Sequence, residues 1–336
     1  MLARIIPWLS WTVAAGAADA PPTPYTAAGA RAAVVVSAAP RTRSPQDTTS
    51  HRESSTIDTT LAFASSGGVV DLSLTSASPL GDISVSGWSR PQVRIHATSE
   101  DAPIRFEASA NRVLLEVREQ RGAYRRHSRD ERGAQFVLEV PVGTRVLMHS
   151  VSADLHAHGI KGELEARTVS GSIDAGDATG RTTLESVSGN IAAHAITGPL
   201  HAEAVNGDVE ISAVNGEDVE VSTVSGDISL LNSRAKVVHT ESVSGPIVYG
   251  GPIDPAGHYD FHSHSGDITL RVSADTKATL SLETFSGSIQ SKGFSIPAQD
   301  DDHDHHGRRV DTTLGGGGAQ ITVETFSGDI TIERGS

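Results

Sequence analysis

The densest group of aspartates and histidines in the sequence is the segment Asp300 to His306, which contains four aspartates and three histidines. Imidazole and carboxylate groups are ligands of Zn, Ni and Cu, and a glycine-rich flank would let such a segment wrap around a metal ion. No strand or helix pattern fixes the geometry of these side chains. We therefore interpret residues 300–306 as a solvated polar loop and assign no metal ligand there.

A second set of carboxylates recurs along the chain directly after glycine, at Asp208, Asp227, Asp267 and Asp329. If these residues line up along one edge of the fold, they could attract Ca²⁺. The calcium-binding solenoid repeat has a denser spacing of Gly and Asp, however, and Ser, Asn or Pro often replaces Asp in this chain. We interpret these aspartates as turn residues whose side chains bond back to the backbone.

The segment Arg118 to Arg132 is rich in arginine, and guanidinium groups suit the oxyanions of acidic polysaccharide or lipid phosphate. Because Glu119, Asp130 and Glu131 offset part of its charge, we interpret residues 118–132 as a mobile polar loop.

Catalysis has little support in the sequence. The histidines are scattered, and neither Gly-x-Ser-x-Gly nor His-Glu-x-x-His occurs. Parallel β-helices do include polysaccharide lyases and hydrolases, whose acids and bases cluster on one outer face. The predicted outward positions carry Glu, Ser, Thr and His without an obvious cluster. We therefore predict a non-enzymatic protein with no catalytic, cofactor-binding or metal-binding residue and no cofactor, and keep a carbohydrate-active β-helix enzyme as the alternative.

The secondary structure that would position any such site is indicated by a repeated sequence motif. The motif consists of an apolar residue, Ser or Asn, Gly, a small polar residue, and Ile or Val. Examples are Val169 to Ile173, Val187 to Ile191, Val224 to Ile228 and Phe326 to Ile330. The glycines recur about every 18 to 21 residues, so each copy is too short to bury a core alone and must stack on its neighbours. This spacing predicts an all-β parallel solenoid with two short strands of about seven residues in each rung.

Alternating residues predict which side chains point inward. We expect the exposed set Glu210, Glu220, Glu283 and Glu324 to face water, and the buried set to be Leu200, Ala202, Ala204, Val209, Ile211, Val219, Val221, Thr223, Ile228, Leu230, Leu280, Leu282, Thr284, Ile321, Val323 and Thr325. Glycine at the corners is expected because it tolerates positive φ. Asn-Gly pairs also suit antiparallel hairpins, but a meander has no reason to keep a constant register.

Composition agrees with a narrow fold. Of 336 residues only 4% are aromatic, so small and β-branched side chains must fill the interior. The net charge of −14 argues against nucleic acid or an anionic membrane as partner, because both require a basic face. Without cysteine the chain has no disulfide or thiol chemistry.

The domain organisation follows from changes in composition. Residues 1–20 predict a cleaved export signal, with Arg4 before an apolar run and small residues before Pro21. Residues 21–55 are a Pro/Ala/Ser/Thr-rich stretch that predicts a disordered linker. We assign 56–150 to an N-terminal β region that caps the solenoid, and 151–334 to the solenoid with a flexible insertion at 291–318. No later stretch could span a membrane, so the mature chain has no predicted span.

Three features together resemble the bacterial putative-adhesin domain family: the repeated Val-Ser-Gly-Asp-Ile phrase, the run Gly81 to Ile95, and Val140 to Thr144 before the first rung. The resemblance covers roughly residues 57 to 334 and implies an exported or envelope-associated β-solenoid, with no catalytic residues to carry over. The predicted protein is therefore periplasmic, cell-surface or extracellular, with a glycan, an envelope protein or another cell-envelope component as its partner. A purely structural spacer is the remaining alternative.

Overall fold

The computed structural model describes residues 55–62, 71–76, 81–99, 103–109, 111–117, 134–296 and 307–335, all within one compact unit, Val35–Ser336. These residues form strands and turns and contain no helix, and hence no helix that could cross a membrane. The predicted signal at 1–20, nearly all of the predicted linker at 21–55, the arginine-rich loop at 118–132 and the Asp/His segment at 300–306 lie outside the described residues.

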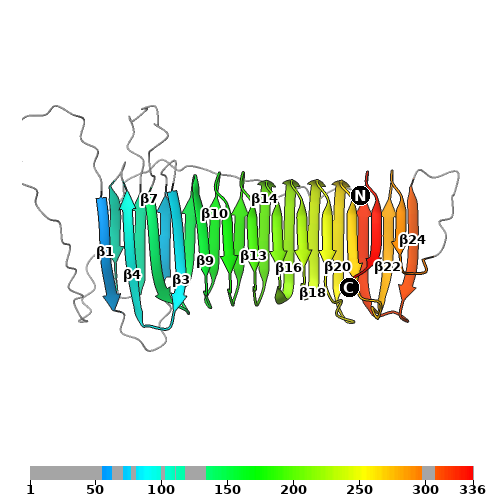
Figure 1. Ribbon diagram of the computed structural model, residues 1–336, viewed down its shortest axis with the longest axis horizontal. Coiled ribbons are helices and arrows are strands. Elements are labelled where there is room, and N and C mark those ends of the chain that lie inside the picture. The colour runs from blue at the N-terminus through cyan, green and yellow to red at the C-terminus, as the bar shows by residue number, and fades with distance from the viewer. Residues whose placement is uncertain are drawn as a thin grey trace, which may run out of the picture. The chain divides into compact units, whose positions relative to one another are not determined.

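The strands form two sheets of 13 strands each (Figure 1). The first sheet has the order β1 (Ser55–Ala62), β4 (Gln92–Ser99), β7 (Ala134–Pro141), β3 (Gly81–Trp88), β9 (Ala153–His158), β11 (Ile173–Gly176), β13 (Ile191–His194), β15 (Val209–Ser212), β17 (Ile228–Leu231), β19 (Ile247–Gly250), β21 (Ile268–Val272), β26 (Ile330–Arg334) and β23 (Ile289–Lys292).

The second sheet has the order β24 (Arg308–Leu314), β22 (Ala278–Thr284), β25 (Ala319–Thr325), β20 (His258–Ser265), β18 (Arg234–Ser244), β16 (Asn215–Ser225), β14 (Leu200–Asn206), β12 (Thr182–Ser186), β10 (Leu164–Thr168), β8 (Arg145–Ser150), β2 (Asp71–Ser76), β6 (Arg112–Val117) and β5 (Ile104–Ala108). From β8 to β21 the chain alternates between the two sheets, so each rung contributes one strand to each.

Neighbouring rungs pair in parallel, as the repeat predicts. Leu164, Thr182 and Leu200 lie side by side 18 residues apart, and Leu200, Val219 and Val238 continue the row at a spacing of 19. In this regular part the strands of the second sheet have 5 to 11 residues, whereas most of those in the first have 4. The fold class is therefore confirmed, with strands of unequal rather than equal length.

The core lies between the two sheets. Every side chain predicted to point inward is buried, including Thr223, Thr284 and Thr325, while Glu210, Glu220, Glu283 and Glu324 are exposed. Several buried Thr and Ser hydroxyls close to the corner bond the backbone there. Thr284 Oγ1, for example, donates to the Gly328 carbonyl oxygen at 2.9 Å. The alternation of side chains thus predicts the core correctly.

The corner glycines stack directly above one another, and this contact, rather than positive φ, requires most of them. A Cβ built on Gly189 would overlap the carbonyl oxygen of Gly171, and one on Gly207 would overlap that of Gly189. Neither glycine has a positive φ. Positive φ is concentrated instead at the second corner, where non-glycine residues such as Ala195 and Asn232 adopt it at 53°. The expected reason for glycine was therefore wrong for most of this column.

Both ends of the solenoid depart from sequential stacking. At the N-terminal end, the rung formed by β2 and β3 lies between two rungs that follow it in the chain: the β8–β9 rung on one side and the β6–β7 rung on the other. Beyond the β6–β7 rung the sheets end in the antiparallel strands β1, β4 and β5. At the other end the last strands, β25 and β26, lie between the β20–β21 rung and the β22–β23 rung (Figure 1). Strand β24 then pairs antiparallel with β22. Part of the expected flexible insertion at 291–318 is therefore a strand, because residues 308–314 complete the edge of the second sheet.

Candidate functional site: a polar ladder on the second sheet

The outer face of the second sheet carries two rows of mainly ionisable side chains, which we call the polar ladder. Thr183, Thr322 and Ser281 interrupt the first row, and Ser222 interrupts the second. Parallel register brings residues one rung apart in the sequence into each row. One row contains Glu165, His201, Glu220, His239, Asp260 and Asp311, and the other contains His149, Arg167, Glu185, Glu203, Glu241, His262, Glu324, Glu283 and Arg309.

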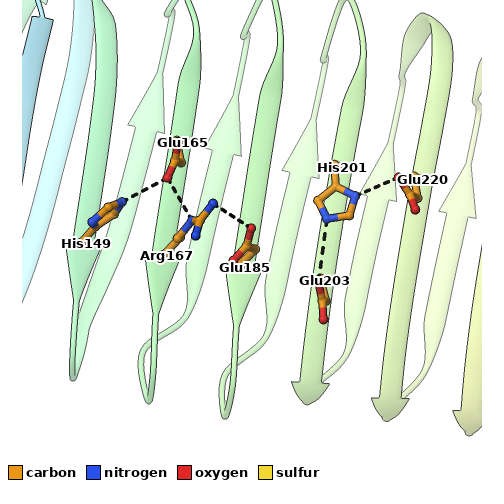
Figure 2. Close-up of polar contacts among 7 residues, drawn as sticks. All are labelled: His149, Glu165, Arg167, Glu185, His201, Glu203 and Glu220. Carbon is orange, nitrogen blue, oxygen red and sulfur yellow. Dashed lines mark hydrogen bonds and ion pairs between the residues drawn. The ribbon is translucent and has the colours of Figure 1, made fainter. Parts of the chain in front are cut away.

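The N-terminal part of the ladder is a chain of polar contacts across β8, β10 and β12 (Figure 2). His149 Nε2 lies 3.2 Å from Glu165 Oε1, and Arg167 Nε lies 2.9 Å from the same oxygen. Arg167 also reaches across to Glu185, with 3.2 Å between Nη2 and Oε1. Glu165 is the least exposed of these side chains at 19%. One carboxylate therefore joins a histidine and an arginine from neighbouring rungs.

His201 is the centre of the next group, on β14 and β16 (Figure 2). Its Nδ1 lies 3.1 Å from Glu220 Oε2 on the adjacent strand, and its Nε2 lies 3.8 Å from Glu203 Oε2 on its own strand. Glu203 and Glu220 both raise the pKa of His201, with the larger effect from Glu203 although Glu220 is nearer. His201 in turn lowers the pKa of Glu203. The group favours an imidazolium held between two carboxylates.

The same pattern continues toward the C-terminal end. His262 Nδ1 lies 3.3 Å from Glu324 Oε2, and Arg309 Nη1 lies 3.4 Å from Glu283 Oε2. Over its whole length the ladder carries nine carboxylates, four histidines and two arginines. The face is therefore acidic at neutral pH, because its carboxylates outnumber its arginines.

The sequence interpretation found no cluster among the outward acids and bases, and the register corrects it. Glu185, Glu203 and Glu241 are far apart in the sequence but lie in one row, because successive rungs place equivalent positions side by side. The signal was present as ionisable residues spaced by one or two repeats. This signal can be recognised only when the exact register between neighbouring strands is known.

The aspartates that follow the corner glycines bond the backbone of the next rung. Asp208 Oδ1 accepts a hydrogen bond from the amide of Asp227 at 3.0 Å, and Asp267 Oδ1 accepts one from the amide of Asp329 at 2.8 Å. The row is interrupted at Pro246, which has no N–H to donate. This geometry agrees with the turn role predicted for these residues.

A groove of about 700 Å³ lies at the second corners, away from the polar ladder. Its lining includes Pro199, Glu217, Arg234, Lys236 and Asp254, and no ladder residue. The ladder itself is a sheet face open to solvent, which suits recognition of an extended surface better than enclosure of a small substrate.

A family model described as Toastrack DUF4097 matches residues 45–244 and 92–333 of the chain. No curated protein matches the chain.

Three solved structures resemble the chain at low sequence identity. A putative lipid binding protein from Parabacteroides distasonis is 10% identical, with 84% of this chain and 97% of that one covered and a TM-score of 0.47. A putative adhesin from Bacteroides fragilis is 13% identical, with 84% and 98% covered and a TM-score of 0.39. A putative cell adhesion protein from Clostridium sporogenes is 10% identical, with 83% and 100% covered and a TM-score of 0.21.

Proposed function

Because the chain belongs to the Toastrack DUF4097 family, a family of putative-adhesin domains, we propose that it is an exported, non-enzymatic adhesin or cell-envelope interaction module. The polar ladder is its binding face. The observation that carries this proposal is the register, which aligns carboxylates and histidines from successive strands between β8 and β24 in two rows on an open sheet face.

The chemistry of the ladder limits the partner. Carboxylates outnumber arginines, so the face repels nucleic acid and anionic lipid and attracts positively charged or hydroxyl-rich groups. The backbone beneath its side chains is held in paired strands, so binding does not require a disordered segment to become ordered. A cell-envelope glycan or a basic patch of an envelope protein fits both conditions. Export rests on the sequence of residues 1–20, and the place of action is the periplasm, the cell surface or the extracellular space.

A matched pair of charge reversals tests the binding face. Glu241 on β18 belongs to the ladder, whereas Glu210 on β15 is an exposed glutamate on the first sheet, so Glu241→Lys and Glu210→Lys change the net charge equally. Binding of the full chain to isolated envelope fractions, measured by co-sedimentation, should fall several-fold for Glu241→Lys and stay unchanged for Glu210→Lys. Loss with Glu210→Lys alone would place the binding face elsewhere.

The alternatives have distinct outcomes in the same preparation. A spacer would leave the wild-type chain unbound to every fraction and to a glycan array. A carbohydrate-active enzyme would release reducing ends from one of those glycans. Glu203→Gln would then abolish this release, because Glu203, His201 and Glu220 form the group on the ladder best placed to act as acid and base. Either result would overturn the proposed binding function.

A further inference from the structure

A separate cluster of histidines lies on the outer face of the first sheet, on β9, β11 and β13. The register places Gly176 between His158 and His194, and Asp174 next to His156 in the adjacent row. None of these residues belongs to the polar ladder. Because Gly176 has no side chain, the two imidazoles on either side of it lean over the same position, with ring centroids 5.6 Å apart.

Asp174 lies against one nitrogen of each of these rings. Its Oδ2 is 3.7 Å from His158 Nε2, and its Oδ1 is 3.7 Å from His194 Nδ1. Both distances are longer than a hydrogen bond, so the carboxylate acts through its charge: it favours the tautomer of each ring that carries the proton on the nitrogen facing it. The lone pair of the neutral ring then lies on the opposite nitrogen, which is Nδ1 in His158 and Nε2 in His194.

Those two opposite nitrogens converge above Gly176. A Cβ placed on Gly176 would lie 2.6 Å from His158 Nδ1 and closer still to His194 Nε2. The two nitrogens therefore lie close together over Gly176. Rotation about the side-chain bonds of these two surface residues brings both to the length of a metal–imidazole bond, about 2.0–2.1 Å, from one ion placed farther from the backbone than that Cβ. The two rings approach each other over β11 only because residue 176 is glycine and has no side chain between them.

We propose that His158 and His194 together bind a divalent transition-metal ion of the Cu²⁺, Ni²⁺ or Zn²⁺ class above Gly176, with Asp174 orienting both rings. Imidazole is the ligand that these ions share, and Cu²⁺ binds most tightly. Within the described ranges no group of three or more His, Asp or Glu side chains is arranged to hold a metal ion, so the protein supplies two ligands and water completes the coordination. Such a site takes up metal reversibly from solution.

The test is isothermal titration of Cu²⁺ into the full chain in a His303→Ala/His305→Ala/His306→Ala background, which removes the histidines of residues 300–306. We expect one binding event that weakens at least tenfold in His158→Ala and in His194→Ala. Gly176→Ala should weaken it equally, because the new Cβ would lie within 2.6 Å of ring atoms of both histidines and must push the two rings apart. The atoms that it displaces are only the ends of two surface side chains. Circular dichroism should show that all three variants keep the parent fold.

The chain offers a matched control. His239 and His262 on the second sheet form another close pair, with ring centroids 5.8 Å apart, so His239→Ala/His262→Ala removes the same chemistry elsewhere. Binding should persist in this double variant. Binding that is lost there and kept in His158→Ala would overturn the proposal, as would parent-like affinity in Gly176→Ala or no measurable Cu²⁺ binding in the background protein.

Discussion

Replacing Gly189 by alanine tests the closest contact between rungs. The added Cβ would overlap the Gly171 carbonyl oxygen, which belongs to the backbone of a paired rung and cannot rotate away. Overpacking of this kind costs about 1–3 kcal/mol. Alanine also lowers the conformational entropy of the unfolded chain relative to glycine, which stabilises the folded state by about 0.4–1 kcal/mol. The expected net loss in the free energy of unfolding is therefore at most about 2.6 kcal/mol, and about 1.3 kcal/mol at the middle of the two ranges.

Gly143 provides the matched control, because it lies in the exposed turn between β7 and β8. No atom lies within 4 Å of a Cβ built there, and its φ is not positive. Gly143→Ala should leave stability unchanged or raise it by up to about 1 kcal/mol through the unfolded state. The two variants contain the same chemical change, so any difference between them comes from rung stacking.

Guanidinium unfolding followed by far-UV circular dichroism gives the comparison, and amide hydrogen exchange locates the effect. Since a rung contacts only its neighbours, faster exchange in Gly189→Ala should be confined to β11, β13 and the strands beside them. Equal stability of Gly189→Ala and Gly143→Ala would refute the close stacking of the glycine column.

The remaining predictions concern the core, the ladder and the turn row. Ile228→Asp should lower the free energy of unfolding by several kcal/mol, since a side chain with 1% exposure is replaced by a carboxylate. Glu220→Ala, at an exposed position, should cost almost nothing. Equal melting temperatures of the two variants would contradict the inward assignment. His201→Gln should cost at most about 1 kcal/mol near pH 5.5, where protonated His201 and ionised Glu203 coexist. The cost should vanish as the pH rises through the raised pKa of His201 and as it falls through the lowered pKa of Glu203; melts that differ equally at every pH would count against this pair. Asp208→Ala removes the acceptor for the Asp227 amide and should cost about 0.5–1.5 kcal/mol in guanidinium unfolding, whereas no loss would show that water replaces it.

The regular rungs could be predicted because their information is local and repeated. Alternation along a strand decides which residues face the core, and the recurring Val-Ser-Gly phrase decides where each corner falls. For this reason Ile228 and Glu220 were placed on the correct sides without knowledge of the register.

The site was harder to predict, because it depends on which residues become neighbours across rungs. His201 and Glu220 are 19 residues apart, and their contact requires the exact pairing of β14 with β16. The histidines above Gly176 belong to rungs on either side of it, so their convergence also needs a backbone position without a Cβ.

The sequence by itself determined the repeat length, the inward side chains and the class of fold, since each follows from spacing within one or two rungs. Tertiary structure alone decided that β25 and β26 insert between earlier rungs, that β24 closes an edge, and that corner glycines are required by their neighbours' carbonyl oxygens. The physical reason is that strand order and close backbone approach depend on contacts between residues distant in the chain. The periodicity of residues within a single strand therefore cannot predict those contacts.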